Sequence, residues 1–155
     1  MVEKLLGVIG GSGLYQMKGL EVIEKVTVNT PFGSPSDSII IGKLAGVKLA
    51  FLPRHGVGHV IPPSEINFRA NIFAMKKIGV ERIISVSAVG GMKENMPPGH
   101  FVVPHQFIDR TYKRISTFFT EGMVGHISMA DPVCLATAGT LFNAAQKTGA
   151  DVHEG

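Results

Sequence analysis

Cysteines, clusters of basic residues and long apolar runs are all scarce in this chain of 155 residues. The single cysteine, Cys134, excludes an intramolecular disulfide, and without a cysteine cluster nothing suggests a zinc site. Lys/Arg runs never exceed two residues and the formal net charge is +3, which argues against nucleic acid as a partner. No apolar run reaches the roughly 18 residues of a membrane helix, and the first segment is too short and glycine-rich for a signal peptide. We therefore expect a cytoplasmic protein with no membrane partner.

The composition is that of an ordinary globular protein, with 45% hydrophobic and 17% charged residues. A chain of this length is expected to bury about two-thirds of its unfolded surface around one core. No internal repeat, low-complexity stretch or linker interrupts the sequence. These observations predict a single domain over residues 1–155.

Short apolar or alternating runs, separated by turn residues, predict a series of strands. The predicted strands cover residues 5–9, 22–28, 38–44, 47–52 and 82–87, and another begins near residue 150. Ala45 and Gly46 join two of these runs and indicate a hairpin. The strand over residues 22–28 alternates in polarity, which is typical of a half-exposed strand.

Two stretches have the periodicity of a helix. The first is predicted to begin at Ser64 as N-cap and to end at Gly79. The second has Asp131 as its predicted cap, Pro132 at its first position and Gly149 at its end. The buried face of this second helix is predicted to contain Leu135, Ala138, Leu141, Phe142 and Ala145.

Strands that flank helices in this way predict an α/β fold with three layers, α/β/α, around a mixed and mostly parallel central sheet. An α/β protein that stops soon after a new strand begins resembles an interrupted chain. The sequence is therefore expected to be a truncated product.

A glycine-rich loop follows the first predicted strand. Gly10, Gly11 and Gly13 permit backbone angles that a side chain forbids, so the loop can turn its N–H groups toward an anion. The Ser12 hydroxyl would be an added donor. The loop lacks the Gly-Lys-Ser/Thr ending of an NTPase loop and the spacing of a dinucleotide fingerprint. Anion binding and a simple bend of the chain both fit this stretch alone.

Polar groups follow three of the predicted strands. They are Ser12 after the first strand, Arg54 and His55 after the strand over residues 47–52, and Ser87 and Ala88 at the end of the strand over residues 82–87. Ligands of open α/β sheets bind at the carboxyl ends of strands. A guanidinium fork, an imidazole, hydroxyls and a backbone N–H suit one phosphate-sized oxyanion. Taken singly, each residue fits a structural role, but together they predict a phosphate site.

Other chemistries are less well supported. His55 and His59 are four residues apart, but they lie in a glycine-containing loop with no nearby carboxylate, so no metal site is expected. Neither Ser12 nor Ser87 lies in a Gly-x-Ser-x-Gly elbow, which argues against a nucleophilic triad. Cys134 fits a small apolar residue better than a nucleophile.

Several motifs together resemble 5′-methylthioadenosine phosphorylases, a family of the trimeric purine nucleoside phosphorylases. They are Val8–Tyr15, Thr30–Asp37, Phe51–Gly56, Ile61–Asn71, Ser85–Gly90, Gln106–Thr111 and Ser128–Pro132. The resemblance covers the whole chain in order. It implies an α/β pentosyltransferase that splits a purine nucleoside with inorganic phosphate as co-substrate and without a cofactor.

The resemblance also implies roles for particular residues. Ser12, Arg54, His55, Ser87 and Ala88 match the family's phosphate-binding positions. His126 matches a histidine that reaches across a trimer interface to the 5′ end of a neighbour's substrate, so a homotrimer or hexamer is expected. Asn67 matches a position in the helix beside the phosphate site. The catalytic acid that protonates the purine is expected beyond Gly155, so none is expected within this chain.

Three functions stay open at this point. The first is phosphorolysis of 5′-methylthioadenosine, and the second is phosphorolysis of a 6-oxopurine nucleoside or methylthioinosine. The third is a non-catalytic module that binds phosphate or a nucleotide. Val57-Gly58 and Gly91–Asn95 match the family only loosely, which leaves the substrate open more than the phosphate site.

Overall fold

The computed structural model describes residues 4–11, 13–14 and 17–155. Contacts within the chain form two compact units. The first contains Met1–Ala88 and Lys113–Phe118, and the second contains Val89–Tyr112 and Phe119–Gly155. Each unit is described by itself, and a single domain over residues 1–155 stays a prediction.

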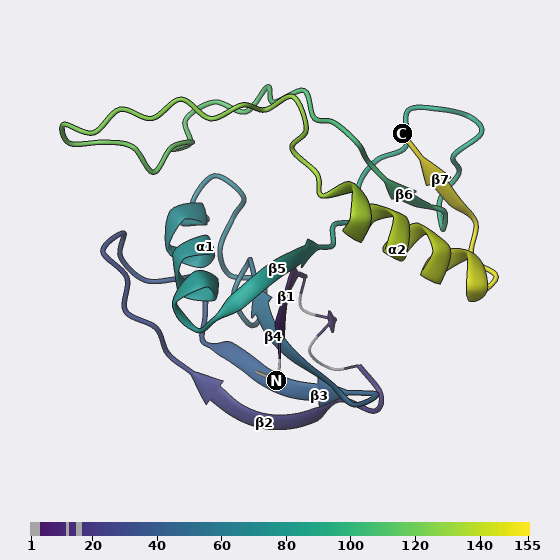
Figure 1. The fold of residues 1–155 in the computed structure, drawn as a ribbon, viewed down its shortest axis with the longest axis horizontal. Coiled ribbons are helices and arrows are strands. Elements are labelled where there is room, and N and C mark those ends of the chain that lie inside the picture. Colours follow the sequence, from purple (N-terminus) through teal and green to yellow (C-terminus); the bar gives the residue numbers. More distant parts are fainter. Residues whose placement is uncertain (1–3, 12, 15–16) are drawn as a thin grey trace. The chain divides into compact units, whose positions relative to one another are not determined.

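The first unit is built on a mixed five-stranded sheet in the order β2-β3-β4-β1-β5 (Figure 1). The strands are β1 (Leu5–Gly10), β2 (Glu21–Val26), β3 (Ile39–Leu44), β4 (Val47–Pro53) and β5 (Val80–Ser85). β1 lies between β4 and β5 and is parallel to both, whereas β2, β3 and β4 pair antiparallel. A second, parallel pair joins β6 (Phe101–Val103) to β7 (Val152–Glu154) in the other unit. Among the described strands the five-stranded sheet is thus mixed, as the sequence predicts, with two parallel and two antiparallel pairs.

The predicted hairpin between β3 and β4 is confirmed, and its turn is formed by Ala45 and Gly46. Both residues have positive φ angles, 47° and 83°. Hairpin turns of this kind match the twist of the strands, but only glycine and asparagine adopt such angles easily. Ala45 is therefore strained where asparagine would not be.

We expect Ala45→Asn to stabilise the first unit by about 0.5 kcal/mol, because asparagine tolerates the left-handed region better than alanine. Urea unfolding measured by circular dichroism would show a higher midpoint with an unchanged slope. Ala45→Val is the matched control and should lower the midpoint, since a β-branched residue is disfavoured at positive φ. An unchanged midpoint in both variants would contradict the role assigned to this turn.

The two faces of the sheet bury different side chains. On one face Ile39, Ile41, Ala50 and Leu52 pack with Ala74 and Met75 of α1 (Phe68–Lys77). On the other face Ile40, Leu49 and Phe51 pack against partly buried residues that include Leu14, Met17 and Leu20. Residues 49–53 of β4 are all buried, as expected from their continuous apolar run. β2, by contrast, is exposed over residues 21–25, with Val22 61% and Ile23 56% exposed. The half-exposed pattern predicted for residues 22–28 is therefore wrong at its start and holds only at its end, where Val26 is partly buried and Val28 is buried.

Helix α1 begins three residues later than predicted, with Asn67 rather than Ser64 as its N-cap. The Asn67 side chain accepts a hydrogen bond from the Ala70 N–H (3.1 Å) and donates one to the Phe32 carbonyl (2.6 Å). Ser64 lies in a preceding turn and is exposed. The Phe32 carbonyl explains why Asn67 is the N-cap in place of Ser64. It gives the Asn67 side chain a second hydrogen bond, which cannot be read from the neighbouring sequence.

The second unit contains α2 (Leu135–Lys147) beside the β6·β7 pair. Cys134 is the N-cap, so the prediction that Asp131 caps a helix beginning at Pro132 is wrong. Nothing in the structure explains why the helix begins later. Of the predicted buried face only Ala138 is buried, while Leu135 is 63% exposed. No helix in the described ranges has the length and apolar character needed to cross a bilayer.

Candidate functional site

The carboxyl ends of β1, β4 and β5 lie level with one another. In the register of the sheet Gly10 is opposite Pro53, and Ile9 is opposite Ser85. The ladder continues beyond the strands, since the Arg54 N–H donates to the Gly10 carbonyl (3.0 Å). The Val86 N–H likewise donates to the Ile9 carbonyl (2.9 Å). The residues that follow the three strands therefore meet at one edge of the sheet, as predicted from the sequence.

The side chain of Arg54 connects two of these strand ends. One guanidinium nitrogen, Nη1, donates to the Ser87 hydroxyl (2.8 Å) and to the Val86 carbonyl (2.6 Å), both after β5. Its Nε donates to Nε2 of His55 (3.0 Å). Arg54, His55 and Ser87 thus form one hydrogen-bonded group, although 33 positions separate Arg54 from Ser87.

His55 is buried, with 7% of its surface exposed, and both ring nitrogens have partners. Nε2 accepts from Arg54, so the ring proton is assigned to Nδ1, which donates to the Ile61 carbonyl at 2.8 Å. The His59 ring stacks on His55 with 4.2 Å between centroids. In this arrangement the imidazole holds the Arg54 guanidinium in place instead of presenting a free donor.

The loop after β4 is tied down by hydrogen bonds that the sequence does not reveal. Gly56 has a φ of 71°, and a Cβ there would lie 3.3 Å from the Ser36 carbonyl. The Val57 N–H donates to Oδ2 of Asp37 (2.8 Å). The other oxygen of Asp37 accepts from the Ser38 N–H (2.7 Å). Sequence reasoning missed Asp37 as a supporting residue, because no local signal connects it to a loop 20 residues away.

The glycine loop after β1 is described in part. Gly10, Gly11 and Gly13 have no φ angle in the left-handed region, and the turning of their N–H groups toward an anion stays a prediction. A Cβ at Gly10 would force the Leu14 side chain to move and would lie 3.4 Å from the Val86 carbonyl. Ser12 lies outside the described residues, so its predicted contact with phosphate is not placed.

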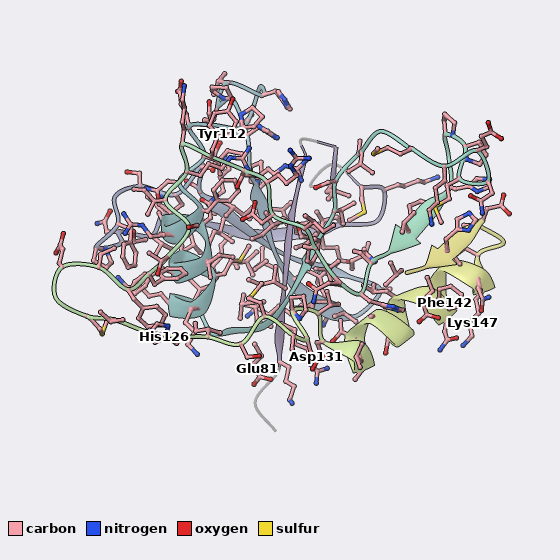
Figure 2. The ribbon with its side chains drawn as sticks, turned by 90° about the horizontal axis from the view of Figure 1, so that it is seen from above. Glu81, Tyr112, His126, Asp131, Phe142 and Lys147 are labelled. Carbon is pink, nitrogen blue, oxygen red and sulfur yellow. The ribbon has the colours of Figure 1, made fainter. Side chains whose placement is uncertain are left out.

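The remaining predicted residues are placed only in part. Ala88 is exposed and follows Ser87, which puts it at the same strand end. His126 is exposed and belongs to the second unit, in an irregular segment without helix or strand (Figure 2). Its predicted contact with a neighbouring subunit's substrate stays a prediction.

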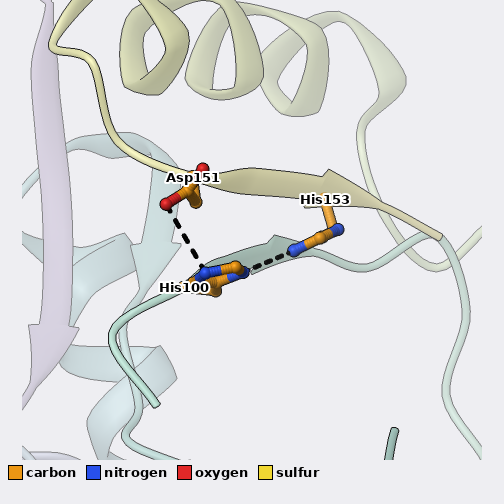
Figure 3. Close-up of polar contacts among 3 residues, drawn as sticks. All are labelled: His100, Asp151 and His153. Atoms are coloured by element: carbon orange, nitrogen blue, oxygen red, sulfur yellow. Dashed lines mark hydrogen bonds and ion pairs between the residues drawn. The ribbon is translucent and has the colours of Figure 1, made fainter. Parts of the chain in front are cut away.

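The second unit has a polar cluster of its own, formed by His100, Asp151 and His153 (Figure 3). Nδ1 of His100 and Nε2 of His153 are 2.8 Å apart, and Nε2 of His100 lies 3.5 Å from Oδ2 of Asp151. These contacts join the segment before β6 to β7. The described residues hold no group of three or more histidine, cysteine or acidic side chains arranged for a metal ion.

The chemistry of the Arg54 group suits an oxyanion. Arg54 contributes a permanent positive charge, and its Nη2 has no hydrogen bond to another described residue. The Asp37 carboxylate accepts hydrogen bonds from two backbone N–H groups, and none of the ion pairs among the described residues involves Arg54. A planar guanidinium that is held from two sides can bind phosphate through its remaining N–H edge.

The chain is similar to known phosphorylases. S-methyl-5′-thioadenosine phosphorylase of Geobacter sulfurreducens is 57% identical over 155 residues, covering 99% of this chain and 54% of that protein. The Synechocystis enzyme of the same name is 58% identical over 144 residues, covering 93% of this chain and 44% of that protein. The chain thus spans about half the length of these curated relatives.

Solved structures show the same fold. A methylthioadenosine phosphorylase from an antarctic soil metagenomic library superposes with a TM-score of 0.90 at 50% identity, over 96% of this chain and 52% of that one. A methylthioadenosine phosphorylase from Schistosoma mansoni in complex with adenine has a TM-score of 0.90 at 37% identity, over 98% of this chain and 63% of that one. The model of the phosphorylase superfamily matches residues 5–155. The chain therefore has the predicted phosphorylase-like α/β fold and belongs to the phosphorylase superfamily.

Proposed function

We propose that this chain forms the phosphate-binding part of an enzyme that cleaves 5′-methylthioadenosine with inorganic phosphate. The observation that carries the proposal is the hydrogen-bonded group of Arg54, His55 and Ser87 at the edge of the sheet. Relatives and structural neighbours named as methylthioadenosine phosphorylases support the choice of substrate. The products are adenine and 5-methylthioribose 1-phosphate.

The reaction needs a phosphate held beside the anomeric carbon of the ribose. The bond from this carbon to the purine nitrogen breaks, the bond to a phosphate oxygen forms, and the purine takes up a proton. Positive charge develops on the ribose in the transition state, and a bound phosphate both stabilises that charge and attacks the carbon. We assign the binding of this phosphate to Arg54, Ser87, Ser12 and the N–H of Ala88, with His55 holding Arg54 in position.

The other elements of the proposal depend more heavily on the relatives. We place the proton donor to the purine in the half of the relatives that this chain does not span. His126 is proposed to contact the 5′ end of a neighbouring subunit's substrate within a trimer or hexamer. Inorganic phosphate is the proposed co-substrate and no cofactor is proposed. A cytoplasmic location stays a prediction.

The proposal is tested by phosphorolysis with a chimera. This chain is joined to the remaining half of the Geobacter sulfurreducens relative, of which it covers 54%. We expect the chimera to release adenine from 5′-methylthioadenosine only when phosphate is present, as measured by chromatography. The chain alone, tested under the same conditions, is expected to bind phosphate without turnover.

Two outcomes would contradict the proposal. Release of hypoxanthine from methylthioinosine, with no adenine from 5′-methylthioadenosine, would move the assignment to a 6-oxopurine enzyme. A folded chimera that binds phosphate without any turnover would favour the non-catalytic binding module.

A further inference from the structure

A second cationic site lies in the first unit, away from the ends of β1, β4 and β5. It is a cavity of about 330 Å³ beside the start of α1. Its lining includes Phe32, Glu65, Phe68, Arg69, Lys113 and Arg114. None of the residues that line this cavity belongs to the Arg54 group.

Two arginines of this cavity are held by aromatic rings. The Arg69 guanidinium carbon lies 4.9 Å from the centroid of the Phe32 ring, and that of Arg114 lies 5.4 Å from the centroid of the Phe68 ring. Stacking occupies the flat face of a guanidinium and leaves its N–H groups at the edge. Neither arginine forms an ion pair or hydrogen bond with another described residue. Both retain their full set of N–H donors for a ligand.

The Phe32 ring, which lies against Arg69, is itself fixed. Phe32 makes edge-to-face contacts with Phe73 and Phe118, at centroid distances of 5.7 and 5.3 Å. The Phe32 carbonyl accepts a hydrogen bond from the Asn67 side chain (2.6 Å), and Asn67 caps α1. Fixed supporting residues lower the entropy lost when a ligand binds. The cavity is therefore preorganised on the side of Phe32 and Arg69.

The charge and size of the cavity indicate the class of ligand. The lining contains two arginines, Arg69 and Arg114, but only one carboxylate, Glu65, so cationic side chains outnumber acidic ones around the cavity. A volume of about 330 Å³ is at the lower end of the range for small-molecule sites, which begins near 300 Å³. We propose that this cavity, the Arg69–Arg114 site, binds the dianion of a small phosphate monoester, with the ester group against the apolar lining.

The test uses glycerol 3-phosphate as the probe and amide NMR shifts of this chain as the readout. We expect saturable shifts at residues 65–69 and 113–115. Arg69→Gln/Arg114→Gln should weaken this binding by at least about tenfold, since each arginine contributes charge-assisted hydrogen bonds. A matched control, Lys43→Gln/Lys76→Gln, removes the same charge from exposed residues of this unit outside the cavity and should change it by less than about twofold.

Further titrations distinguish binding at this site from binding at the phosphate site of the proposed function. Arg54→Ala should leave the shifts at residues 65–69 and 113–115 unchanged, so a failure at either site is visible independently of the other. Glycerol and succinate should cause little shift at these residues, and inorganic phosphate should bind there more weakly than the ester. The proposal would be overturned by an absence of shifts, by shifts that survive Arg69→Gln/Arg114→Gln, by loss of the shifts in Arg54→Ala, or by equal binding of succinate.

Discussion

Arg54→Ala is expected to weaken the binding of inorganic phosphate to this chain by about 1.5–3 kcal/mol, or roughly 10- to 150-fold, because it removes a charged donor from the site. Arg54 joins the end of β4 to the end of β5 through Ser87 and Val86, and it is oriented by His55. No other described residue in this group has a permanent positive charge. Isothermal titration with phosphate measures the loss directly.

Two further variants separate charge from geometry at this site. Arg54→Lys keeps the charge but loses the planar fork, so we expect it to recover only part of the affinity. Ser87→Ala removes one neutral hydroxyl and should cost about 0.5–1.5 kcal/mol. Phosphate affinity that stays at the wild-type value in Arg54→Ala, with the fold intact by circular dichroism, would refute the assignment of this site.

Asn71→Ala is expected to destabilise the first unit by about 2–3 kcal/mol, which is a large share of the stability of a small domain. Asn71 is a buried polar residue of α1, with 2% of its surface exposed. Its Oδ1 accepts from the Ser36 N–H (2.8 Å), and its Nδ2 donates to the Ser36 hydroxyl (2.9 Å). Alanine would leave the Ser36 N–H without its partner in a partly buried position, which costs more than the hydrogen bond itself is worth.

Urea unfolding of Asn71→Ala should show a lower midpoint than that of the unchanged chain. The matched control is a substitution on the same helix. Lys76→Ala changes an exposed residue of α1 and should alter the stability by less than about 0.5 kcal/mol. Ser36→Ala keeps the backbone N–H bonded to Asn71 and should cost less than Asn71→Ala. Equal midpoints for Asn71→Ala and Lys76→Ala would show that this buried pair contributes nothing to stability.

The sequence predicts the meeting of Arg54 and Ser87 because the rule behind it is general. Parallel strands place their carboxyl ends at one edge, so polar residues that follow such strands come close together. The structure confirms this proximity with a hydrogen bond of 2.8 Å. The sequence does not show which residues of the group contact one another. His55 binds to Arg54 and to the Ile61 carbonyl, and this depends on how the loop over residues 54–61 folds back on itself.

The helices show where local signals stop being sufficient. Ser64 is a reasonable cap by its neighbours in sequence, but Asn67 has a tertiary partner in the Phe32 carbonyl that only the fold supplies. The periodicity of α2 identifies an apolar face, yet Leu135 on that face is 63% exposed. Periodicity shows which side of a helix is apolar, but it carries no information on what covers that side.

The placement of β1 between β4 and β5 links the phosphate site to the folding of the sheet. The Arg54 group forms only when β4 and β5 have both paired with β1, since Arg54 and Ser87 come from segments more than 30 positions apart. An anion that binds this group therefore recognises the folded sheet and ignores the unfolded chain. Because it would bind only the folded state, phosphate would stabilise the first unit by RT ln(1 + c/Kd), where c is the concentration of free phosphate, so that the proposed co-substrate would also favour folding.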